Sequence, residues 1–130
     1  MVDINLRAPL AISLGAIAGA LSRYYLTLAF SRWLGTTFPY GTFAINLSGA
    51  FIMGFFTTLA FESVVLSPDL RLLITVGFLG SYTTFSTYAL DTANLLRIDS
   101  WFVTLFYWLG SAFLGVISLE IGSFLARKLL

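Results

Sequence analysis

Four long apolar stretches, joined by short segments that carry charges and helix breakers, make up most of the chain. The stretches cover about residues 10–30, 42–61, 70–90 and 101–126. Each is long enough, at roughly 20 residues, to cross a hydrocarbon core of ~30 Å as a helix. The pattern therefore predicts an all-α membrane protein, with one transmembrane domain over residues 1–130 and four helices that span a lipid bilayer.

The third stretch contains polar and aromatic residues where a lipid-facing helix would carry Leu and Ile. From Thr83 to Tyr88 the sequence reads Thr-Thr-Phe-Ser-Thr-Tyr, and Gly77 and Gly80 precede this run. Polar side chains at bilayer depth are costly and usually line a cavity or a pathway. Irregular backbone is tolerated there only where protein buries it or water reaches it. We therefore expect a break in the third helix, where Gly80 lets the backbone leave helical geometry, and a functional site beside it.

Helical geometry over this run would place four polar side chains on one face: Thr84, Thr87, Tyr88 and Asp91. The Phe85 ring would lie about 60° around the helix from Tyr88, so that both rings border one groove. Hydroxyls donate hydrogen bonds to an anion without carrying charge, and aromatic ring edges are weakly positive. Such a groove suits a small, strongly hydrated anion that binds with intermediate strength. The alternative is that hydroxyls of the run, including that of Ser86, bond back to their own helix carbonyls.

Two further polar residues lie inside the apolar stretches. Asn46, with Thr42 one turn before it, offers two amide donors to an anion, or else makes a hydrogen bond that only joins helices. Arg23 either draws anions into a vestibule or extends its guanidinium to the lipid headgroups. The sequence leaves both pairs of alternatives open, and it also allows an ion pair between Arg23 and Asp91.

The composition narrows the possible chemistry. The chain is 58% hydrophobic, has a formal net charge of +1, and contains no histidine or cysteine. Thiol chemistry, histidine acid–base catalysis and the common zinc sites are therefore excluded. No base accompanies the many Ser and Thr residues as a partner for nucleophilic catalysis. We expect neither an enzyme nor a nucleic-acid-binding protein.

The loops show almost no positive-inside bias, which leaves the orientation in the membrane open. The Lys and Arg residues divide four to three between the two sides: Arg7, Arg71, Arg127 and Lys128 against Arg23, Arg32 and Arg97. A chain that inserts both ways would pair with an oppositely oriented copy. Stripes of small residues, such as Gly15-x-x-x-Gly19, allow close helix packing, which is the simpler role for most of these glycines. Stripes on so many helices also favour contacts with a second copy. The alternative is that a small residual bias fixes one orientation.

Three motifs follow one another along the chain: Gly15-x-x-x-Gly19-x-x-x-Arg23, Gly41-Thr42-x-x-x-Asn46-x-x-Gly49, and Gly77-x-x-Gly80-x-x-Thr83-Thr84-Phe85-Ser86-Thr87-Tyr88. In their order, and in the length and four spans of the chain, they resemble the Fluc (CrcB) fluoride channels. The second and third motifs together are specific, whereas the glycines of the first would be a weak signal alone.

This resemblance implies an antiparallel, dual-topology homodimer with two pores that export fluoride passively across the cell inner membrane. It implies that Asn46 is the pore amide, that Phe85 is the first of two paired aromatic rings, and that Ser111 belongs to a hydroxyl track. It also implies a structural sodium ion (Na+) on the dimer axis, held by the backbone carbonyls of Gly80 and Thr83.

Residues and resemblance together predict a fluoride pathway, with Arg23 in its vestibule, along these side chains: Asn46, Phe85, Tyr88, Thr84, Ser86, Thr87, Ser111 and Thr42. The chain departs from the family at Tyr88, where the second ring is usually Phe. A phenol there can hydrogen-bond to fluoride or obstruct its path. It departs again at Gly115, where a hydroxyl is often found, so that the track is shorter here or is completed by Ser118.

Two other functions are compatible with four apolar spans. A small dual-topology multidrug exporter needs a carboxylate in the first span, but this chain has no Asp or Glu there and carries Arg23 instead. A non-transporting membrane scaffold has no need for the Thr83–Tyr88 run.

Overall fold

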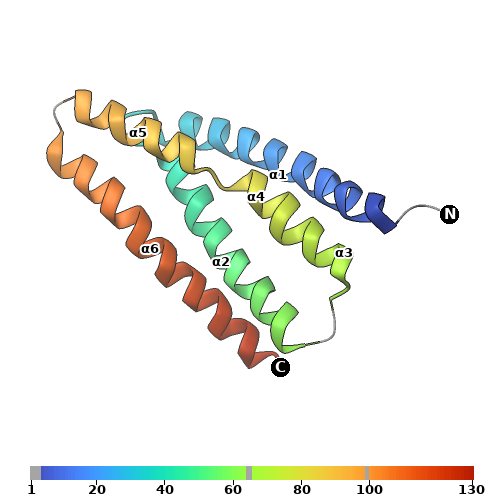
Figure 1. Cartoon of the computed structure of the whole chain (residues 1–130). Coiled ribbons are helices and arrows are strands. Elements are labelled where there is room, and N and C mark those ends of the chain that lie inside the picture. The colour runs from blue at the N-terminus through green and yellow to red at the C-terminus, as the bar shows by residue number, and fades with distance from the viewer. Residues whose placement is uncertain (1–3, 64–65, 99) are drawn as a thin grey trace.

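The computed structural model describes residues 4–63, 66–98 and 100–130, where all of the secondary structure is helical (Figure 1). Residues 64, 65 and 99, which belong to predicted loops, lie outside the described residues. Three long helices match the first, second and fourth apolar stretches: α1 (Ile4–Leu34), α2 (Tyr40–Glu62) and α6 (Trp101–Lys128). The third stretch is divided into shorter segments: α3 (Pro68–Arg71), the π-helical segment η1 (Leu72–Leu79), α4 (Gly80–Tyr82) and α5 (Phe85–Arg97). The all-α prediction is confirmed, although α5 continues beyond the predicted end near residue 90.

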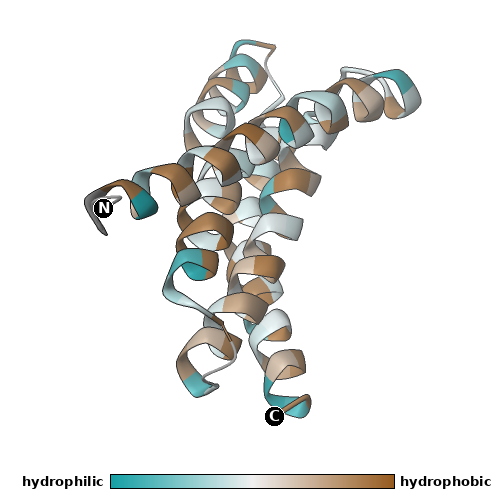
Figure 2. Cartoon of the chain, turned by 90° about the vertical axis from the view of Figure 1, so that its right-hand side faces the viewer, coloured by the Kyte–Doolittle hydropathy of each residue, from teal (hydrophilic) through white to brown (hydrophobic). Residues whose placement is uncertain are grey.

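Apolar residues recur along the helices, as the brown bands in Figure 2 show, and many large apolar side chains are exposed. The helices α2 and α6 are each long and apolar enough, by length and composition, to cross a membrane. In α6 several large rings are exposed, including those of Phe102, Phe113 and Phe124. A helix that is apolar on every side needs an apolar environment around it, such as a lipid bilayer or a partner chain. The structure therefore agrees with a membrane protein.

Glycines bring the helices into close contact. Between α2 and α6, a Cβ on Gly54 would lie 2.0 Å from a carbonyl oxygen of α6, and a Cβ on Gly122 would lie 2.1 Å from a carbonyl oxygen of α2. In α1, Gly15 and Gly19 approach carbonyl oxygens of η1 about as closely. The small-residue stripes thus pack helices within one chain. This is the plain helix packing that the sequence favoured for most of these glycines, and it does not test contacts with a second copy.

The core lies where α2 meets the divided third stretch. Ile45, Leu79 and Tyr82 are buried together. The Tyr82 hydroxyl also lies 2.9 Å from Oγ of Ser48 on α2, within hydrogen-bond distance. This packing and this polar contact fix α4 against α2, just before the backbone changes direction.

The backbone leaves helical geometry between α4 and α5, at Thr83 and Thr84. Thr83 has φ −77° and ψ 157°, and Thr84 has φ −149° and ψ 116°, so both are extended. Figure 1 shows the resulting interruption between α4 and α5. Gly80 has φ −62° and ψ −30°, which is ordinary helical geometry. The expectation that Gly80 releases the backbone is therefore wrong.

Candidate functional site

Asn46 on α2 holds the extended residues between α4 and α5. Its Nδ2 donates to the Thr84 carbonyl at 3.0 Å, and the Thr84 N–H donates to its Oδ1 at 2.8 Å. The side-chain amide thus pairs with the Thr84 backbone much as a neighbouring β-strand would. Of the two roles that the sequence left open, the interhelical one is present. The amide also has a second N–H that these two bonds do not use.

Thr84 begins α5 as its N-terminal cap. Its Oγ1 accepts from the Thr87 N–H at 3.2 Å and donates to the Thr87 Oγ1 at 2.9 Å. A threonine that satisfies one of the free N–H groups of a first turn stabilises the helix start. Thr84 therefore precedes α5 and does not stand on its face, which corrects the helical placement predicted from the sequence.

These two sets of bonds release two backbone carbonyls from helical pairing. In a continuous helix the Gly80 carbonyl would accept from Thr84, and the Thr83 carbonyl from Thr87. The Thr84 N–H goes to Asn46 instead, and the Thr87 N–H goes to the Thr84 side chain. The break thus leaves carbonyl oxygens at Gly80 and Thr83 without the donors that a helix would supply.

A cavity opens beside the break, between α2, α5 and α6. We call it the aromatic groove; its volume is about 370 Å³, and it is lined by Asn46, Ala50, Thr83, Thr84, Phe85, Tyr88, Ser111 and Ala112. The ring centroids of Phe85 and Tyr88 are 5.8 Å apart with an interplanar angle of 48°. Phe85 is 80% exposed, so the groove is not enclosed by one chain alone. The groove joins hydroxyls, an amide and ring edges, and no charged side chain lines it.

Tyr88 reaches across the groove to α6. Its hydroxyl donates to the backbone carbonyl of Trp108. The phenol is therefore tied to the protein and is not free to donate to an ion, which removes one of the two effects that the sequence allowed for it. On the same stretch of α6, the Ser111 Oγ is buried and has no hydrogen-bond partner within the described residues.

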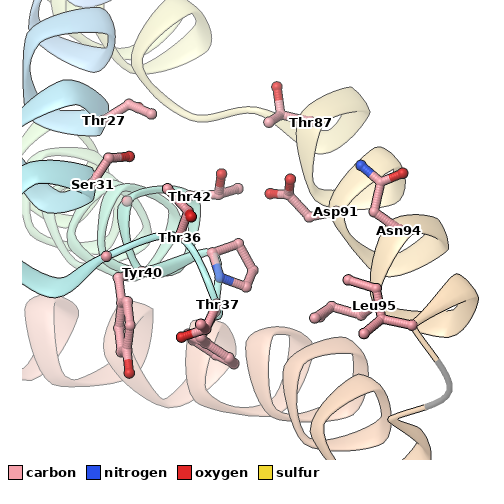
Figure 3. Close-up of a pocket in the computed structure, with 15 residues that line it drawn as sticks. Thr27, Ser31, Thr36, Thr37, Tyr40, Thr42, Thr87, Asp91, Asn94 and Leu95 are labelled. Atoms are coloured by element: carbon pink, nitrogen blue, oxygen red, sulfur yellow. The ribbon is translucent and has the colours of Figure 1, made fainter.

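A second polar space lies on the other side of Thr84, between α1, α2 and α5 (Figure 3). It consists of two cavities of about 270 Å³ and 310 Å³ that share Thr27, Thr42 and Thr87, and we call it the polar vestibule. In Figure 3, Thr27 and Ser31 of α1 face Thr87 and Asp91 of α5 across this space. Arg23 of α1 lines the 310 Å³ cavity of the vestibule, and its Nε is buried without a hydrogen-bond partner in the described part of the chain.

Comparison with known proteins identifies the family. The family described as "CrcB-like protein, Camphor Resistance (CrcB)" matches residues 10–123. The chain belongs to the CrcB-like family. It is 61% identical to the "Fluoride-specific ion channel FluC" of Trichormus variabilis, over 95% of this chain and 90% of that protein. Proteins with the same name from a Synechococcus strain and from Synechocystis are 55% and 53% identical, over 98% and 96% of both chains.

In this CrcB-like chain the structure distributes the predicted pathway residues over two spaces. Five line the aromatic groove: Asn46, Thr84, Phe85, Tyr88 and Ser111. Thr42 and Thr87 line the polar vestibule with Arg23, and Thr84 borders both spaces. Ser86 is exposed and lines none of these cavities. The polar run is therefore not a single track.

The sequence left open that hydroxyls of the Thr83–Tyr88 run bond to carbonyls of their own helix, and part of the run does so. The Thr83 Oγ1 donates to the Leu79 carbonyl at 2.9 Å, so its side chain completes its own helix. The hydroxyls of Thr84 and Thr87 bond to each other at the break instead. The Thr83 side chain is thus structural, whereas its carbonyl lacks the N–H donor that a continuous helix would supply.

Tyr107 is a site residue of the CrcB-like chain that sequence reasoning missed. It is fully buried in α6, and its hydroxyl donates to Asp91 Oδ2 at 3.1 Å, beside the polar vestibule. Asp91 therefore pairs with a phenol, and the structure shows no ion pair between Asp91 and Arg23 within the residues it describes. The available signal was spacing, since Tyr107 lies four residues before Ser111 on the same helix.

Proposed function

We propose that this chain is a fluoride-selective channel that exports fluoride passively and so lowers its concentration in the cytoplasm. The observation that carries the proposal is the aromatic groove, in which an amide, hydroxyls and two aromatic rings meet without a fixed charge. The names of relatives that are 53–61% identical over most of both chains support the choice of anion. Selective conduction needs binding that is strong enough to admit an ion and weak enough to release it.

The two spaces suggest a sequence of environments for the ion. The Arg23 guanidinium would raise the local anion concentration in the polar vestibule. Hydroxyls of Thr42 and Thr87, which line the vestibule together with Thr84, would replace part of the hydration shell. Beyond Thr84, the spare Asn46 N–H and the ring edges of Phe85 and Tyr88 would hold the ion weakly. No side chain on this route needs to change its covalent state, so the proposal involves no enzymatic step.

Growth in fluoride tests export in cells. We expect a bacterial strain that lacks its own fluoride exporters to grow in fluoride when it expresses this chain, because passive efflux keeps cytoplasmic fluoride low. The same strain with an empty vector should stop growing at that concentration. Equal growth inhibition in the two strains, with the protein present in the membrane, would contradict the proposal.

We further propose that the channel is an antiparallel, dual-topology homodimer in the cell inner membrane. The exposed Phe85 ring leaves the groove open on one side, and a second chain could close it. The nearly even division of Lys and Arg between the two sides supports insertion in both orientations. Tags at each terminus should therefore be accessible from both sides of the membrane in intact cells. A single orientation for every molecule would exclude the antiparallel dimer.

We also propose that the released carbonyls of Gly80 and Thr83 bind a structural sodium ion where two copies meet. A small hard cation accepts oxygen ligands, and two copies would supply four such oxygens. No carboxylate occurs between Asp69 and Asp91, so a divalent ion would be poorly neutralised there. The ion would stabilise the dimer and would take no part in conduction.

The open space at Gly80 provides the test of this cation site. A Cβ on Gly80 would meet only the Thr75 carbonyl oxygen, at 4.0 Å, so the single chain has room for a side chain there. We expect Gly80→Leu to abolish both the dimer and fluoride flux, because the added side chain would enter the space between copies. Thr83→Ser should change little, because the proposed ligand is the backbone carbonyl. Size-exclusion chromatography and fluoride efflux measure both, and a flux-competent Gly80→Leu dimer would refute the site.

A further inference from the structure

Among the described residues, Ser111 has the one side-chain hydroxyl that is buried and has no hydrogen-bond partner. In helices, Ser and Thr hydroxyls commonly donate to the carbonyl three or four residues earlier. Many in this chain do so, with the acceptor at 2.6–3.1 Å: Ser48, Thr57, Ser63, Thr75, Thr92 and Thr104. The Ser111 Oγ is equally shielded from solvent, but it makes no such bond. A buried hydroxyl without a partner is costly, so its free state needs a physical cause.

The carbonyl three residues before Ser111 belongs to Trp108, and it is the one that Tyr88 uses. A backbone carbonyl has two lone pairs, and in an α-helix one of them accepts the helical N–H bond. The Tyr88 hydroxyl donates to this same oxygen from α5. Of the two carbonyls within reach of the Ser111 hydroxyl, the one at i−3 therefore has no vacant lone pair, and the one at i−4, that of Tyr107, receives no bond from Ser111 either.

The Tyr88 ring is well placed to keep this arrangement. It lies 5.8 Å from the Phe85 ring and 5.4 Å from the Tyr107 ring, measured between centroids. Rings on two sides restrict its rotation, so its hydroxyl stays directed toward Trp108. Tyr88 and Ser111 also line the same groove.

We propose that Tyr88 is a positioning residue for Ser111: its hydroxyl occupies the Trp108 carbonyl and so keeps the Ser111 hydroxyl as an uncommitted donor for the anion. The inference rests on the proposed function, because it assigns Ser111 to the fluoride pathway. The enclosed position of the Ser111 oxygen favours a small, dehydrated acceptor such as fluoride over a larger anion. Without the Tyr88 hydroxyl, Ser111 would turn back to Trp108, and its contribution to fluoride binding would be lost.

A double-mutant cycle on fluoride efflux from liposomes tests this coupling. In the wild-type background, Ser111→Ala should lower the efflux rate about fivefold, the change that one neutral hydrogen bond produces. In a Tyr88→Phe background, which keeps the ring and removes only the hydroxyl, Ser111→Ala should have almost no further effect. Tyr82→Phe is the matched control, since it removes a buried hydroxyl contact with Ser48 but does not line the groove. In that background Ser111→Ala should keep its full effect.

The possible outcomes distinguish a failure of the proposed channel function from a failure of the coupling between Tyr88 and Ser111. If wild-type protein releases no fluoride, the proposed function fails and the assignment of Ser111 to a fluoride pathway fails with it. If wild-type protein releases fluoride and Ser111→Ala lowers the rate equally in the wild-type and Tyr88→Phe backgrounds, the channel function stands and the coupling is refuted. Loss of the Ser111→Ala effect in the Tyr82→Phe background as well would also refute it, because general loosening of the helices would then explain the result.

Discussion

Replacing Asn46 with aspartate is expected to lower fluoride efflux by at least about 100-fold. A carboxylate about 4 Å from an ion that the Asn46 N–H would otherwise hold would repel it by roughly 4 kcal/mol at an effective dielectric constant of ~20, which corresponds to about three orders of magnitude in rate. The substitution also removes the Nδ2–H that donates to the Thr84 carbonyl, and it places a second oxygen beside that carbonyl. Efflux from liposomes, with dimer content checked by size-exclusion chromatography, measures the effect.

Asn46→Leu separates the two contributions. This variant loses both bonds to Thr84 but adds no charge, so it should destabilise the break by about 1–3 kcal/mol and lower efflux less than Asn46→Asp does. If the two variants lose flux equally, Asn46 acts only by holding the break. Near-normal flux in folded Asn46→Asp protein would remove Asn46 from the pathway.

The second large effect is expected at the contact between α2 and α6. Gly122→Ala would place a Cβ 2.1 Å from the Phe51 carbonyl oxygen and 3.1 Å from the Phe55 backbone nitrogen. These are backbone atoms, which cannot move aside as a flexible side chain would, so the two helices must separate. Such overpacking costs about 1–3 kcal/mol or more. We expect a clear loss of thermal stability in detergent, together with a lower yield of folded protein.

Gly115→Ala on the same helix is the matched control. A Cβ at this position meets no atom of the chain within 4 Å. Alanine also favours a helix over glycine by about 1 kcal/mol, so the variant should be as stable as the wild type or slightly more stable. If Gly122→Ala were as stable as Gly115→Ala, the close approach of α2 and α6 in this structure would be incorrect.

The long helices could be predicted from the sequence because their apolar pattern is local. The first, second and fourth stretches coincide with α1, α2 and α6, apart from extensions at their ends. The prediction failed where a residue distant in the sequence decides the local geometry. Gly80 was expected to release the backbone, but the Asn46 amide takes the Thr84 N–H from 38 residues away, so the extended residues lie later in the chain.

The candidate site, too, could be predicted from the sequence only in part. Residue types in the Thr83–Tyr88 run correctly directed attention to the cavities beside the break, yet Ser86 lies outside them and Thr84 caps a helix. Tyr107 was missed because one tyrosine in an apolar helix resembles a packing residue until its bond to Asp91 is seen. The hydrogen bond from the Tyr88 hydroxyl to Trp108 could not be predicted either, because it depends on the distance between α5 and α6, which residue spacing in the sequence does not give.

Anion selectivity in purified protein tests the central claim most directly. Liposomes that contain the wild-type protein should be loaded with potassium fluoride or potassium chloride, and efflux should be started with a potassium ionophore and followed with ion-selective electrodes. The account predicts rapid release of fluoride and retention of chloride, because hydroxyls, an amide and ring edges in an uncharged groove favour the smaller ion. Release of chloride as fast as fluoride, or of neither ion from liposomes that contain folded protein, would contradict it.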